Sequence, residues 1–108
     1  MLGPYNAMWL MVGFDLPTQT KEQVRFANRF RNDLLDLGFT RFQFSFYTYF
    51  LTSKERADLL ATKIARLVPP NGHVCIFFIT DKQFGMIRNY YGGRKVSIDV
   101  PEQGLLFE

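Results

Sequence analysis

Hydrophobic residues follow different periods in successive parts of this chain. Residues 8–14 are apolar as one block up to Asp15, and residues 73–80 form a second block of the same kind. An apolar block that stops at Pro17, or that begins just after a turn containing Gly72, is typical of a buried strand. Because residues 73–80 are apolar on both faces, we predict that this strand is central in its sheet.

Two other segments have the helical period of about 3.6 residues. The first opens at Thr20, with Gln23 spaced as a capping box, and closes at Gly38. The second opens at Thr52, with Glu55 in the same spacing, and ends at a Pro-Pro-Asn-Gly turn. The apolar positions expected to face inward are Ala27, Phe30, Leu34 and Leu37 in the first helix, and Ala57, Leu60, Ile64 and Leu67 in the second.

Residues 39–51 alternate with period two, which predicts strands. We expect Phe42, Phe44, Phe46 and Phe50 on one face, and Arg41, Gln43, Ser45, Tyr47 and Tyr49 on the other. No Gly or Pro marks a hairpin turn here, so we infer two strands joined at a bend near residues 45–47.

The resulting order of strand, helix, strand, strand, helix, strand is the α+β, ferredoxin-like βαββαβ unit. Two helices cover only one face of a four-stranded sheet, yet the strands carry large apolar residues on both faces. A second copy related by a two-fold axis is the simplest cover, so we predict a symmetric homodimer through the sheet faces. We divide the chain into a leader (1–7), one domain (8–95) and a tail (96–108), which we expect to add an extension strand at the dimer edge.

Composition narrows the class of protein. A chain of 108 residues with 47% hydrophobic residues has room for one compact core, and this excludes the disordered class. The apolar runs are interrupted by Asp15, Arg41 and Thr80, so we expect no membrane span and a cytoplasmic protein. Cys75 is the single cysteine and lies in an apolar run, from which we expect a buried, inert thiol rather than a disulfide or a zinc site.

Basic residues are unevenly distributed. Residues 1–95 carry all thirteen Lys and Arg against seven of the ten acids, and the last ten residues carry the other three acids. An excess of positive charge suits a phosphate-bearing partner, although a solvated helix face gives the same pattern. The candidate nucleic-acid-binding residues are Lys21, Arg25 and Arg29 on the first helix, and Arg88, Arg94 and Lys95 around the Gly92-Gly93 turn.

Three segments together resemble the CRISPR-associated Cas-two proteins. They are Gly13-Phe14-Asp15-Leu16-Pro17, then Gly38-Phe39 leading into Gln43-Phe44-Ser45-Phe46-Tyr47, and Thr80-Asp81-Lys82-Gln83-Phe84. The third is similar to members found beside single-protein effector nucleases. The resemblance implies a symmetric dimer held between two dimers of the Cas-one integrase, where it binds a short DNA duplex that the integrase inserts into the CRISPR array.

The resemblance also implies a role for Asp15. In the family, this Asp approaches its two-fold mate and is the proposed ligand of a divalent metal, usually Mg²⁺, so Asp15 is the metal ligand and the catalytic residue if the protein is a nuclease. From the residues alone, an Asp that hydrogen-bonds the turn at Leu16-Pro17 is the simpler interpretation. Three functions therefore stay open: a DNA-binding scaffold, a metal-dependent endonuclease acting on RNA or DNA, and an RNA-binding module. Apolar residues on both sheet faces argue against the third.

Overall fold

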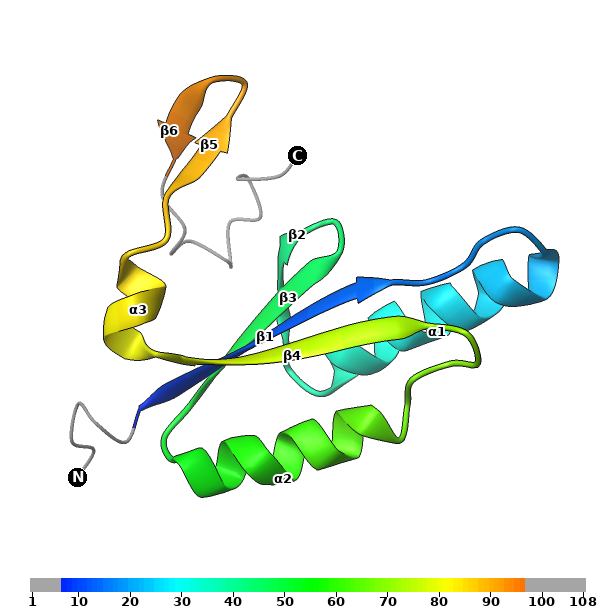
Figure 1. The fold of residues 1–108 in the computed structure, drawn as a ribbon, viewed down its shortest axis with the longest axis horizontal. Helices are drawn as coiled ribbons and strands as arrows, with labels where there is room; N and C mark the ends of the chain where they lie inside the picture. The colour runs from blue at the N-terminus through cyan, green and yellow to red at the C-terminus, as the bar shows by residue number, and fades with distance from the viewer. Residues whose placement is uncertain (1–6, 97–108) are drawn as a thin grey trace.

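The protein is described here by a computed structural model that places residues 7–96. They form two main helices, one short helix, a four-stranded sheet and a separate two-stranded hairpin (Figure 1). In chain order the elements are β1 (Met8–Asp15), α1 (Lys21–Asp36), β2 (Thr40–Gln43), β3 (Phe46–Leu51), α2 (Lys54–Ala65), β4 (His73–Thr80), α3 (Asp81–Gly85), β5 (Asn89–Tyr91) and β6 (Arg94–Val96).

The four-stranded sheet is antiparallel, in the order β2-β3-β1-β4. Its core lies on one face, where α1 and α2 pack against the middle strand β1. Leu10 and Val12 of β1, Phe30 of α1 and Ile64 of α2 are all fully or almost fully buried in one cluster. The predicted α+β, ferredoxin-like fold is confirmed, and both helices present the apolar faces expected from their periodicity.

The predicted central position of the last strand is wrong. β4 lies at the edge of the sheet and pairs only with β1, whereas β1 lies between β3 and β4. One face of β4 packs against the helix-side core through Val74 and Ile76, while the other face is largely open. A strand that is apolar on both faces therefore does not need a strand neighbour on both sides.

The first helix cap is confirmed and the second is corrected. The Thr20 hydroxyl accepts from the Gln23 backbone N–H at 3.1 Å, completing the predicted capping box. In α2 the cap is Ser53 rather than Thr52, because the Ser53 hydroxyl accepts from the Arg56 N–H at 3.2 Å. Adjacent hydroxyl residues both suit an N-cap, and spacing alone selected the wrong one.

The bend between β2 and β3 is found close to its predicted position, at residues 44–45. The register shifts between Arg41 and Gln43, which marks a β-bulge. Tyr47 is buried against the helices, on the face of the sheet opposite to that of Phe46 and Phe50. Phe44 does not join the other phenylalanines on a sheet face; it lies in the turn and is exposed.

α3 was not predicted from the sequence. Thr80 and Gln83 form a capping box that starts this short helix directly after β4. The helix folds back over the face of the sheet opposite α1 and α2, where the Phe84 ring stacks on Trp9 with centroids 3.8 Å apart. The Trp9 indole N–H also donates to the Asp81 carboxylate at 2.8 Å, so β1 holds α3 in place.

Removing this hydrogen bond should loosen α3 measurably. We expect Asp81→Ala to lower the free energy of unfolding by about 0.5–1.5 kcal/mol, the usual net contribution of one hydrogen bond. Trp9 is the only tryptophan, so its fluorescence should report the change directly. Asp81→Asn keeps a carbonyl acceptor and Asp36→Ala removes an exposed acid elsewhere; an equal loss in either control would contradict a role for the Trp9–Asp81 bond.

β5 pairs with β6 in a hairpin that stands apart from the main sheet (Figure 1). Gly92 and Gly93 form its turn with φ of +59° and +82°, values that favour glycine. The extension strand expected in the tail (96–108) lies outside the described residues, which end at Val96. Within residues 7–96, none of the helices is long and apolar enough to cross a membrane.

Candidate nucleic-acid interface and the open sheet face

One face of the four-stranded sheet has no main helix on it, and we call it the open face. Leu10, Val12 and Phe14 of β1 point into the helix-side core, so the residues between them point the other way. Directly opposed residues of antiparallel strands share a face, which places the β3 and β4 partners of these residues on the open face as well. The open face thus consists of Trp9, Met11 and Gly13 in β1, Phe46, Thr48 and Phe50 in β3, and Cys75, Phe77 and Ile79 in β4.

The open face is covered at one end only. Phe84 of α3 lies over Trp9, and Phe50 contacts the same indole edge-on at 5.1 Å between centroids. Farther along the strands, Phe77 keeps 47% of its surface exposed. Gly13 leaves room for the Phe46 ring, since a Cβ there would lie 2.6 Å from Phe46 Cε1. Beyond the end covered by α3, this largely apolar surface has no partner element from the described part of the chain.

Asp15 ends β1 at the uncovered end of this face, and its side chain is exposed. The β1–β4 register places His73 directly opposite Asp15. The two residues are far apart in sequence, so only strand pairing brings them together. His73 is exposed at the start of its strand.

Asp15 fits a magnesium site only in part. Among residues 7–96, no group of three or more His, Cys, Asp or Glu side chains is arranged to hold a metal ion. Mg²⁺ keeps several water ligands and is commonly bound through one or two carboxylates. An exposed carboxylate at a strand end suits such a water-rich site, and a second copy of Asp15 would be the source of the second carboxylate.

Cys75 is exposed, so the expectation of a buried thiol is wrong for the single chain. It points to the open face, which neither main helix covers. Its Sγ lies 3.5 Å from Nε2 of His73, two positions earlier on the same face of β4.

The predicted cations of the first helix lie together on the solvent face of α1. Lys21, Arg25 and Arg29 are all exposed. Arg25 Nη2 is 3.8 Å from Glu22 Oε2, an exposed pair of the kind that contributes little stability. The side chains are therefore available to an external anion.

The other predicted cations lie on a different part of the molecule. Arg88 precedes β5, and Arg94 and Lys95 follow the glycine turn in β6; all three are exposed. The hairpin projects away from α1 in Figure 1, so one chain presents two separate basic areas rather than one continuous patch.

Comparison with known proteins identifies the family. The sequence model described as "CRISPR associated protein Cas2" matches residues 8–87. Proteins named "CRISPR-associated endoribonuclease Cas2" from Flavobacterium psychrophilum and Paracidovorax avenae are 43% and 42% identical to this chain. The first alignment covers 96% of this chain and 90% of the relative, and the second covers 99% and 100%. The chain belongs to the Cas2 family.

A solved structure supports the fold. The chain matches one described as "Crystal structure of cas2" with a TM-score of 0.57 and 23% sequence identity. The match covers 87% of this chain and 99% of the other. The Cas2 sequence model stops at residue 87, before the basic hairpin, but the alignments with both bacterial Cas2 relatives cover nearly the whole chain.

Arg31 is a feature of this Cas2 family member that sequence reasoning missed. Its guanidinium lies 4.8 Å from the centroid of the Phe44 ring and 5.5 Å from that of Phe14, and it donates to Asn28 Oδ1 at 3.3 Å. Burial raises the pKa of nearby Tyr47, while the charges of Arg31 and Arg41 act in the opposite direction. Arg31 thus holds the β2–β3 turn against α1. In the sequence, the only indication of this separate role is that Arg31 lies outside the helix face that carries Lys21, Arg25 and Arg29.

Proposed function

We propose that this protein is a dimeric scaffold of CRISPR adaptation, which binds prespacer duplex DNA and bridges Cas-one integrase dimers. Membership of the Cas2 family supports a CRISPR role. The observation that carries the scaffold is the open face, a largely apolar sheet surface on which Phe77 of the edge strand β4 is 47% exposed. A second copy with the same surface is self-complementary under a two-fold axis.

Dimerisation would also extend the basic surface. Each chain presents one basic area on α1 and another on the β5–β6 hairpin, and a two-fold axis would give four such areas on one rigid body. Cations spread in this way neutralise backbone phosphates along a duplex without reading its bases. A scaffold for DNA of varied sequence needs this kind of binding.

The α1 cations can be tested through the salt dependence of binding. The slope of log K against log salt is negative, and each lost phosphate contact reduces its magnitude by about 0.9. If both copies contact one duplex, Arg25→Ala with Arg29→Ala should therefore reduce the magnitude of the slope by about 3.6. Fluorescence anisotropy with two duplexes of unrelated sequence, in the presence of the integrase, would measure it. Lys54→Ala with Arg56→Ala on α2 is the matched control.

We expect the double variant to bind both duplexes more weakly than wild type, and by the same factor. Wild-type affinity across the salt range would show that the α1 stripe is only a solvated surface. In that case the DNA contacts would have to come from Arg88, Arg94 and Lys95.

A divalent-metal-dependent endonuclease acting through Asp15 is the second candidate. The names of the bacterial relatives and the pairing of Asp15 with His73 favour it. A bound Mg²⁺ would neutralise charge on the phosphodiester and favour attack by water. In this chain Asp15 would hold the ion, and the basic side chains would position the nucleic acid.

A further inference from the structure

The only histidine and the only cysteine of the chain lie side by side on β4. His73 and Cys75 are two positions apart in the strand, so their side chains project from the same face. The Cys75 Sγ lies 3.5 Å from the His73 Nε2, and both residues are exposed. A weak hydrogen bond accounts for this contact, but the same separation also suits two ligands of one metal ion.

The distance between the two atoms matches the coordination geometry of zinc. Zn²⁺ binds thiolate sulfur at about 2.3 Å and imidazole nitrogen at about 2.0–2.1 Å, and it prefers a tetrahedral arrangement. At the tetrahedral angle, these bond lengths place sulfur and nitrogen about 3.5 Å apart. The Cys75 Sγ and the His73 Nε2 already have this separation, so neither side chain needs a large movement to accept the ion.

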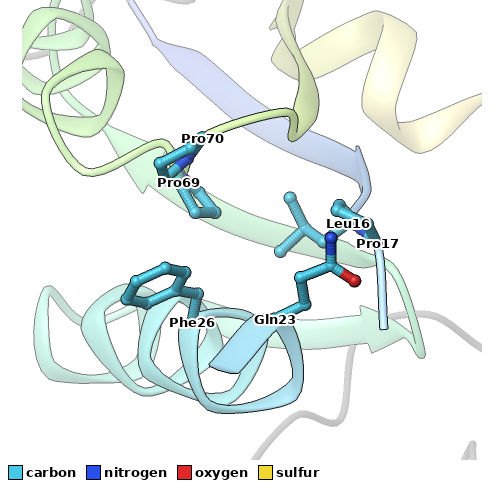
Figure 2. Close-up of a pocket in the computed structure, with 6 residues that line it drawn as sticks. All are labelled: Leu16, Pro17, Gln23, Phe26, Pro69 and Pro70. Atoms are coloured by element: carbon cyan, nitrogen blue, oxygen red, sulfur yellow. The ribbon is translucent and has the colours of Figure 1, made fainter. Parts of the chain in front are cut away.

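The start of β4 is held firmly against the end of β1. Gly72, just before His73, packs closely on Leu16, since a Cβ there would lie 2.6 Å from Leu16 Cδ2. Leu16 in turn points into the space between Pro69 and Phe26 of α1 (Figure 2). The cavity that remains there is about 10 Å³, enough for about one water molecule. The backbone that carries the two side chains is therefore in place before any ligand binds, which lowers the entropy lost on binding.

The neighbours of the pair leave room for a cation. Gly13 lies opposite Cys75 and is covered by the Phe46 ring, which forms an apolar wall on that side. Asp15 lies opposite His73, and its exposed carboxylate favours positive charge nearby. Within residues 7–96, no set of three His, Cys, Asp or Glu side chains surrounds a metal position, so water would fill the other coordination positions.

We propose that His73 and Cys75 of one chain chelate a thiophilic divalent cation, with Zn²⁺ as the ion that fits. The imidazole binds through Nε2 and keeps its proton on Nδ1, whereas the thiol releases its proton and binds as the thiolate. Nitrogen and sulfur ligands select zinc over magnesium, so this site is distinct from a Mg²⁺ site at Asp15. It uses residues of a single chain and depends neither on the proposed dimer nor on DNA binding.

Cobalt provides the first test, on the full chain without an affinity tag and with its thiol reduced. A thiolate bound to Co²⁺ gives a charge-transfer band in the near ultraviolet, and Cys75 is the only cysteine that can produce it. We expect the band to reach its maximum at one Co²⁺ per chain. One equivalent of Zn²⁺ should abolish it, because zinc binds such ligands more tightly than cobalt, whereas a large excess of Mg²⁺ should leave it unchanged.

Three variants separate a chelate from other ways of binding the ion. His73→Asn should weaken Co²⁺ binding by about 100-fold or more, since the loss of a group that merely supports a metal ligand already costs about 10- to 100-fold. Cys75→Ser should remove the band. Asp15→Asn, on the neighbouring strand, is the control and should keep both the band and the stoichiometry. Circular dichroism checks that each variant is folded.

Three results would overturn the proposal. Absence of the band in the wild-type protein at saturating Co²⁺ would mean that the contact between Sγ and Nε2 is only a hydrogen bond. Wild-type affinity in His73→Asn would reduce the site to a single thiolate. Loss of the band in Asp15→Asn would assign the ion to Asp15 instead.

Discussion

Phe77→Asp should convert the proposed dimer to a monomer. Phe77 lies on the open face of β4 opposite Met11, and 47% of its surface is exposed in the single chain. A carboxylate buried at this position in both copies would cost about 2 kcal/mol or more per copy, which corresponds to roughly 1,000-fold in the dimer dissociation constant. Sedimentation velocity at micromolar concentration would measure the change.

Leu59→Asp is the matched control for this variant. Leu59 is 73% exposed on α2, on the side of the molecule away from the open face, so its replacement should leave the dimer intact. Circular dichroism should show that both variants are folded. If Phe77→Asp sediments as wild type, the open face is not the dimer interface. The proposal of a dimeric scaffold would then lose the observation on which it rests.

Asp15→Ala should separate the two candidate functions. If any Mg²⁺-dependent cleavage of RNA or DNA is found, we expect this substitution to reduce it about 100-fold or more, the loss typical of a group that stabilises transition-state charge. Spacer integration by the reconstituted complex should stay within about two-fold of wild type, since the scaffold needs phosphate contacts rather than Asp15. Asp36→Ala, an exposed acid on α1, is the control for a general change in charge.

The opposite pattern would favour the enzyme. Loss of integration in Asp15→Ala, with the dimer and its affinity for duplex DNA intact, would mean that the carboxylate takes part in the reaction. Asp15→Asn retains the size of the side chain and would show whether the negative charge itself is required.

Local patterns predicted most of the fold. Thr20 with Gln23 located the start of α1, and the spacing of Phe30 and Leu34 identified its buried face. The same Thr and Gln spacing at residues 80 and 83 marks the start of α3, but this helix has only five residues. Periodicity is informative in long segments and weak in such a short one.

Strand order and register could not be predicted from the sequence alone. The apolar block at residues 73–80 predicted a strand correctly, but its position at the sheet edge depends on the packing of the whole domain. His73 becomes the neighbour of Asp15 through the β1–β4 register. Such contacts between distant residues depend on tertiary structure, so a single sequence gives little indication of them.

Sedimentation of a fluorescently labelled duplex with the wild-type protein at low salt would show whether the protein is a dimeric DNA-binding scaffold. We expect an intact duplex that carries two copies of the 12.6 kDa chain, with the same stoichiometry for unrelated sequences. A duplex that carries a single copy, or one that is cut in a magnesium-dependent manner instead of being held, would contradict it.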